Sequence, residues 1–104
     1  MIKDENLVKM KATVESILPG SRIILFGSRS RGDYESQSDY DILVIVKQNL
    51  NVKEKRQYAS LITDKLAEIE ILVDVIVKTE DDINYYRDKI GSITREAVLK
   101  GINI

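Results

Sequence analysis

Residues 27–41, with the sequence GSRSRGDYESQSDYD, are the stretch that decides the fold. They connect an apolar segment at 22–26 (RIILF) to a second apolar segment at 39–47 (DYDILVIVK). Both segments have the length and aliphatic content of β-strands, and the second is apolar on both faces, as central strands are. The sequence therefore places a Gly-Ser turn at the end of one strand and two aspartates at the start of the next.

The remaining chain is predicted to alternate between helices and one further strand. An apolar stripe at helical spacing predicts a helix over 4–18, which Pro19-Gly20 ends, and a second helix over 51–68. The run IEILVDVIV at 69–77 predicts a third strand because it is rich in β-branched residues. Two short helices are expected at 81–90 and 92–100.

The connections between these segments predict the topology. The Gly-Ser turn can lie beside the aspartates only if the first two strands run antiparallel. The helix over 51–68, with Asn51 and Glu54 as a capping box, then returns the chain so that strands two and three run parallel. We expect one α/β (α+β) domain over residues 1–104, with a three-stranded mixed sheet in the order 1-2-3 and helices packed against it.

Composition limits the chemistry that is available. The 104-residue chain has no cysteine and no histidine, so thiolate sites, disulfides and imidazole bases are excluded. Metal chemistry must then rest on carboxylates, whose hard oxygens select magnesium or manganese. The net charge of −1 is unfavourable for general nucleic-acid binding. The sequence begins without the apolar run of a signal peptide and has no membrane-spanning segment, so we expect a cytoplasmic protein.

Asp39 and Asp41 are the first candidate metal ligands. Residues two apart in a strand point to the same face, so the two carboxylates project together and repel unless a cation lies between them. The alternative is that Asp39 ends a polar loop and Asp41 is an exposed strand start. The neighbouring Gly-Ser turn favours the metal.

Asp74 is the third candidate, because it interrupts a run of aliphatic residues at 71–77. In a buried strand an unpaired carboxylate would cost on the order of several kcal/mol, which a metal shared with Asp39 and Asp41 would remove. The alternative is an edge strand that exposes Asp74 to water.

The Gly-Ser turn is a candidate phosphate site. Gly27 lets a phosphate approach the backbone, Ser28 adds a hydroxyl donor, and a helix beginning at residue 28 would point its amides at the anion. Arg29 and Arg31 add positive charge to the same place, although surface arginines are often merely solvated. The position of the turn after a strand, with ten residues between Ser28 and Asp39, gives this weak motif its weight.

The pattern of Gly27-Ser28, ten residues, Asp39-Tyr40-Asp41 and a later Asp74 resembles the DNA polymerase β-type nucleotidyltransferase superfamily. Within it, the short chain resembles the minimal nucleotidyltransferase (MNT) antitoxins, the partners of HEPN-domain toxins. The resemblance implies that Gly27 and Ser28 bind the triphosphate of ATP and that the three aspartates hold two Mg²⁺ ions, with Mn²⁺ as a substitute.

By the same resemblance, the activity would be transfer of AMP from ATP to a hydroxyl of the HEPN toxin, with a tyrosine as the expected acceptor. Two other readings stay open at this point. The chain could neutralise a toxin by binding alone, with an idle nucleotide site, or it could modify a small molecule or an RNA end.

Overall fold

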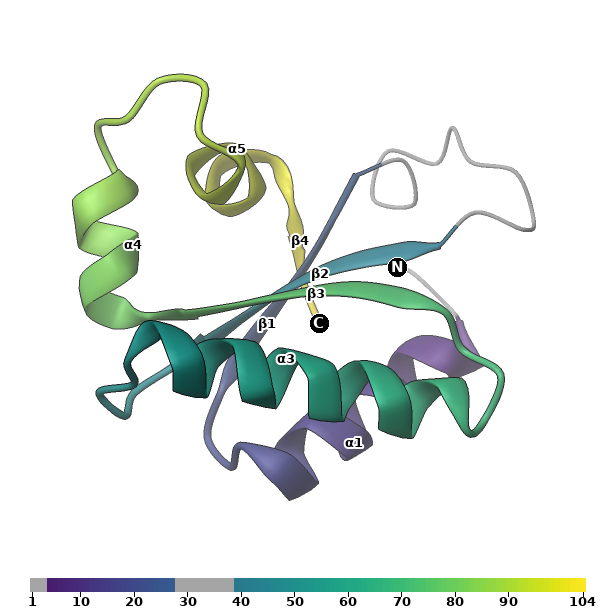
Figure 1. Cartoon of the computed structure of the whole chain (residues 1–104). Coiled ribbons are helices and arrows are strands. Elements are labelled where there is room, and N and C mark those ends of the chain that lie inside the picture. The colour runs from purple at the N-terminus through teal and green to yellow at the C-terminus, as the bar shows by residue number, and fades with distance from the viewer. Residues whose placement is uncertain (1–3, 28–38) are drawn as a thin grey trace.

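The computed structural model describes residues 4–27 and 39–104. Figure 1 shows a sheet with α1 and α3 on one side and α4 and α5 on the other. The elements follow the chain in the order α1 (Glu5–Ile17), β1 (Arg22–Phe26), β2 (Tyr40–Val46), α3 (Val52–Ala67), β3 (Val73–Thr79), α4 (Glu80–Tyr86), α5 (Ile93–Lys100) and β4 (Ile102–Asn103).

The sheet has the order β3-β2-β1-β4. β1 and β2 run antiparallel and β2 and β3 run parallel, which confirms the predicted topology of the first three strands. The prediction of three strands is wrong, because β4 adds a fourth beside β1, with Leu25 opposite Ile102 and Ile24 opposite Asn103. A strand of two residues is too short to show any alternation in the sequence.

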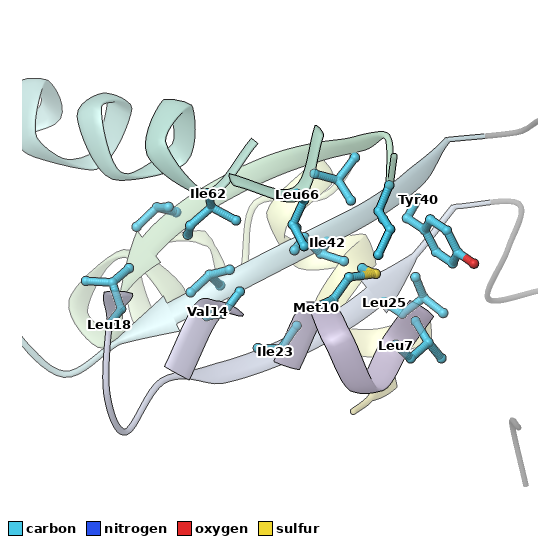
Figure 2. Packing of buried hydrophobic residues seen from close by; sticks show 14 of the residues in the cluster. Leu7, Met10, Val14, Leu18, Ile23, Leu25, Tyr40, Ile42, Ile62 and Leu66 are labelled. Carbon is cyan, nitrogen blue, oxygen red and sulfur yellow. The ribbon is translucent and has the colours of Figure 1, made fainter. Parts of the chain in front are cut away.

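The main core lies between the sheet and the two helices α1 and α3 (Figure 2). β2 is buried along almost its whole length, which confirms its prediction as a central strand. Its side chains alternate between two faces. Those of Ile42, Val44 and Val46 join this core, together with Met10 of α1 and Ile62 of α3.

A smaller apolar cluster covers the opposite face of the sheet. It joins Ile24 of β1 and Leu43 and Ile45 of β2 to Ala97 of α5. Asp41 lies two residues before Leu43 in β2, so strand alternation places it on this second face. The face that carries Asp41 is therefore the one that α4 and α5 partly cover. Within residues 4–27 and 39–104, no helix is both long and apolar enough to cross a bilayer.

The helix starts are close to their predicted positions because capping side chains define them. Asp4 caps α1 by accepting a hydrogen bond from the Asn6 amide. Asn51 and Glu54 form the predicted capping box of α3. Ser92 caps α5, as expected from the sequence. α4 ends at Tyr86, four residues earlier than predicted.

The third strand begins four residues later than predicted. Residues 69–72 are apolar enough to resemble a strand, but they form the exit from α3, where Glu70 has a φ of 62°. The amide of Ile71 donates to the Leu66 carbonyl and so ends the helix. β3 consequently runs from Val73 to Thr79 and forms one edge of the sheet.

Candidate active site

Gly27 and Asp41 are in close contact at the end of the β1–β2 ladder. Phe26 and Asp41 are register partners across the two strands, and Gly27 follows directly with a φ of 74°. A Cβ atom at position 27 would overlap the Asp41 Oδ2 atom and lie 3.1 Å from Cγ. Glycine is needed here for two reasons, since both the backbone conformation and the space exclude a side chain.

Asp41 and Asp74 are partners in the parallel ladder between β2 and β3. Paired residues of neighbouring strands project from the same face of a sheet, so both carboxyl groups belong to the face that α4 and α5 partly cover. The expectation that Asp74 is buried is wrong: β3 is an edge strand and Asp74 is exposed. The burial cost that made Asp74 a candidate ligand in the sequence is therefore absent. Its register with Asp41 is the observation that connects Asp74 to the site.

Asp39 lies one residue before β2 and is exposed. Within residues 4–27 and 39–104, no group of three acidic side chains is arranged closely enough to hold a metal ion. Asp39, Asp41 and Asp74 thus share the same end of two neighbouring strands without forming a closed metal cage. The predicted phosphate contacts of Ser28, Arg29 and Arg31, and the helix expected to begin at residue 28, lie outside the described residues.

Tyr40 fixes the strand start from the opposite face, a role that the sequence prediction missed. Its ring is buried in the main core, as Figure 2 shows. Its hydroxyl donates to the Oδ2 atom of Asp4 at 2.5 Å and accepts from the Asn6 side chain at 3.3 Å. The Tyr40 amide also donates to the Leu72 carbonyl at 3.1 Å. These bonds anchor the residue between Asp39 and Asp41 to both α1 and the entrance of β3.

A pocket of about 450 Å³ opens between this end of the sheet and α5. Its volume is within the range of small-molecule sites. Phe26, Gly27 and Asp41 form the wall contributed by the sheet. The opposite wall comes from the last part of the chain, namely Gly91, Ile93, Glu96, Ala97 and Lys100. Gly27 and Asp41 therefore border a space that can hold a ligand.

Glu96 and Lys100 form an ion pair on the α5 wall, with 2.9 Å between Glu96 Oε2 and Lys100 Nζ. The hydrogen bond from Lys100, assisted by its charge and that of Arg95, holds the pKa of Glu96 below its ordinary value. The Glu96 carboxylate is therefore ionised at neutral pH, and the pocket has a negative and a positive group side by side.

The fold is that of a class of enzyme, the nucleotidyltransferases. Residues 7–100 match the nucleotidyltransferase domain family, and the chain belongs to this family. Two curated relatives come from Methanocaldococcus jannaschii. "Putative protein adenylyltransferase MJ0141" is 35% identical over 75 residues, which are 70% of this chain and 76% of the relative. "Putative protein adenylyltransferase MJ0604" is 35% identical over 63 residues, or 61% of this chain and 58% of the relative.

Solved structures show the same fold. A putative nucleotidyltransferase from Sulfolobus solfataricus matches with a TM-score of 0.58 and 28% identity, over 95% of this chain and 82% of its own. A chain from the complex of a tri-AMPylated Shewanella oneidensis HEPN toxin with its MNT antitoxin matches with a TM-score of 0.56 and 20% identity. That match covers 95% of this chain and 68% of the other. At this level of identity the match establishes a shared fold.

Proposed function

We propose that this chain transfers AMP from ATP to a hydroxyl group of a partner protein. The observation that carries the proposal is the contact between Gly27 and Asp41, which line one pocket, with Asp74 in register with Asp41 on the neighbouring strand. A turn that only glycine can form, placed against a carboxylate, suits a phosphate bound through a cation. The names of the M. jannaschii relatives support protein as the acceptor.

The chemistry of the donor atoms present suits divalent metal ions. The Asp41 carboxylate occupies the position that a Cβ atom at residue 27 would take, and the donors are hard carboxylate oxygens, which suit Mg²⁺ or Mn²⁺. Asp39, Asp41 and Asp74 would hold two ions. When bound, such ions neutralise phosphate charge and make the acceptor hydroxyl easier to deprotonate. Asp39 and Asp74 are exposed, so a metal ion and a substrate could reach both carboxylates from solvent.

The proposed reaction is an in-line displacement at the α-phosphorus. The acceptor oxygen forms a bond to that phosphorus, and the bond from the phosphorus to the α,β-bridging oxygen breaks. Pyrophosphate leaves with the electron pair of that bond. The proton of the acceptor hydroxyl passes to Asp74, which is exposed and can release it to water. Gly27, with Ser28, Arg29 and Arg31 after it, would bind the phosphates.

We further propose that the acceptor is a tyrosine of a HEPN-type toxin, so that modification makes this chain an antitoxin. Two structural neighbours support this assignment. One is a toxin–antitoxin structure with AMP-PNP, and the other contains an AMPylated HEPN toxin. Among the described residues that line the pocket, none carries a hydroxyl group, and a separate partner would therefore have to present the acceptor to it.

The test is to incubate the chain with a HEPN-type protein, ATP and Mg²⁺, and to weigh both proteins by intact mass spectrometry. We expect the partner to gain mass in whole AMP units, and the Asp39→Asn/Asp41→Asn double variant to abolish the gain. A partner that is bound and inhibited but keeps its mass would instead identify this chain as a binding antitoxin.

A further inference from the structure

The α5 wall of the pocket is chemically different from the wall around Asp41. Ile93 and Ala97 give it an apolar surface, and Phe26 of β1 lies on the opposite side of the same pocket. Apolar surfaces of this kind suit a nucleobase, which stacks on aromatic side chains and packs against aliphatic ones. If Gly27 binds the phosphates and Asp41 binds the metal, the apolar part of the pocket is the place left for the base.

Glu96 and Lys100 provide the directional contacts on that wall. Both side chains line the pocket, and their 2.9 Å ion pair places an acceptor next to a donor. Their helical spacing of four residues keeps the two groups on one face of α5. The pair is accessible, with 40% of the Glu96 side chain and 79% of the Lys100 side chain exposed, so a ligand can reach both groups.

A pair of this kind matches one edge of a purine. Adenine and guanine both accept a hydrogen bond at N7, whereas the group at position 6 donates in adenine and accepts in guanine. Lys100 can donate to N7 of either base. The Glu96 carboxylate can only accept, so it favours the amino group of adenine and repels the carbonyl oxygen of guanine. We propose that Glu96 and Lys100 recognise the adenine base of the nucleotide and make Glu96 the residue that selects ATP over GTP.

This inference rests on the proposed nucleotidyl transfer, and the test separates the two. Dissociation constants are measured in Mg²⁺ for non-hydrolysable analogues of ATP and GTP and for inorganic tripolyphosphate, which has no base. The wild-type chain is expected to bind the ATP analogue roughly tenfold or more tighter than the GTP analogue, the discrimination typical of one well-placed pair of hydrogen bonds.

Glu96→Gln should reduce this ratio to within about threefold, because an amide can donate to the guanine oxygen. Lys100→Met should weaken both purine analogues by roughly fivefold to tenfold, the loss of one charge-assisted hydrogen bond. Neither change should alter tripolyphosphate binding by more than about twofold, within the error expected of a distant substitution. Lys65→Met is the matched control, since Lys65 is likewise in the last turn of its helix, α3, but lies outside this pocket.

Three results would overturn this inference alone. An unchanged ratio in Glu96→Gln, or a wild-type chain that does not discriminate, would show that the pair does not read the base. Tripolyphosphate binding weakened as much as ATP binding in Lys100→Met would make Lys100 a phosphate ligand. If one of these results is found but Asp41→Asn still abolishes nucleotide binding, the proposed nucleotidyl transfer is retained and only the selection of the base by Glu96 and Lys100 is rejected. A wild-type chain that binds no nucleotide would overturn both.

Discussion

Gly27 and Asp41 lie against each other so closely that the space for a Cβ atom at position 27 is occupied by the Asp41 carboxyl group. The two residues come from different strands, and the β1–β2 register brings them together. Position 27 therefore requires glycine for the contact with the Asp41 carboxylate as well as for the backbone conformation of the turn. This contact gives the most specific structural prediction about catalysis.

Gly27→Ala should reduce AMP transfer by about a hundredfold, because the new methyl group must displace the Asp41 carboxylate from its position. Gly20→Ala is the matched control, since Gly20 has a similar φ of 80° but no atom within 4 Å of its Cβ position. Both substitutions should cost about 1–2 kcal/mol of unfolding free energy from the left-handed backbone alone. Denaturant unfolding and transfer rates measure the two effects. Equal losses of activity would mean that the contact has no catalytic role.

Asp74→Asn should leave stability unchanged within about 0.5 kcal/mol, because the side chain is exposed on an edge strand. Transfer should nevertheless fall by roughly tenfold to a hundredfold or more, in line with the loss of a metal-site carboxylate. Asp88→Asn, at another exposed position outside the pocket, should change neither quantity. Retained transfer in Asp74→Asn would show that Asp74 is not part of the active site. A large loss of stability would show that its side chain is not freely exposed to water.

Tyr40→Phe should cost about 1 kcal/mol of unfolding free energy, since the Asp4 carboxylate loses the hydrogen bond from the tyrosine hydroxyl. The same change loosens the strand start between Asp39 and Asp41, so we expect metal-nucleotide affinity to fall severalfold. Calorimetric titration with Mg²⁺ and an ATP analogue provides the measurement. Tyr85→Phe, at a residue that is 64% exposed, is the control. Unaltered affinity in Tyr40→Phe would show that Tyr40 stabilises the core but does not position the candidate metal ligands.

Asp82 predicts an acid-sensitive contribution to stability. Partial burial raises the pKa of Asp82, but hydrogen bonds from Lys55 and from the Thr79 amide together lower it by more. The pKa of Asp82 in the folded chain is therefore below its ordinary value. A carboxyl group with a lowered folded pKa stabilises the fold above its unfolded pKa and loses that contribution as pH falls through the folded value.

Asp82→Asn should therefore cost about 1 kcal/mol at pH 7 and progressively less below pH 4, because it removes the Lys55 ion pair and weakens the α4 capping box. Urea unfolding of both chains at a series of pH values tests this. If the free-energy cost of Asp82→Asn stayed constant as the pH fell well below about 4, the ionised Asp82 carboxylate would not be the cause of that cost.

The sequence predicted those parts of the fold whose signals are local. β1 was placed at Arg22–Phe26, and the capping box of Asn51 and Glu54 located α3, because caps and apolar runs are written in adjacent residues. The start of β3 was missed because Ile69 and Leu72 have strand-like side chains. Both are exposed in the turn after α3, where helix termination outweighs β propensity.

The candidate site was predicted in part for the same reason. The two-residue spacing of Asp39 and Asp41 indicates a shared face, but the exposure of Asp74 depends on which strand forms the sheet edge. Glu96 and Lys100 could be recognised from sequence as an i, i+4 ion pair. That they line a pocket with Asp41 depends on how α5 packs on β1, which no local pattern encodes.

Transfer of a radiolabel from ATP to the HEPN-type partner tests the central claim most directly. ATP labelled at the α-phosphate is compared with ATP labelled at the γ-phosphate, in the presence of Mg²⁺, for the wild-type chain and Asp41→Asn. Nucleotidyl transfer predicts that the α label becomes attached to the partner, that the γ label leaves with pyrophosphate, and that Asp41→Asn transfers neither. Attachment of the γ label, or an α label transferred equally well by Asp41→Asn, would contradict the account.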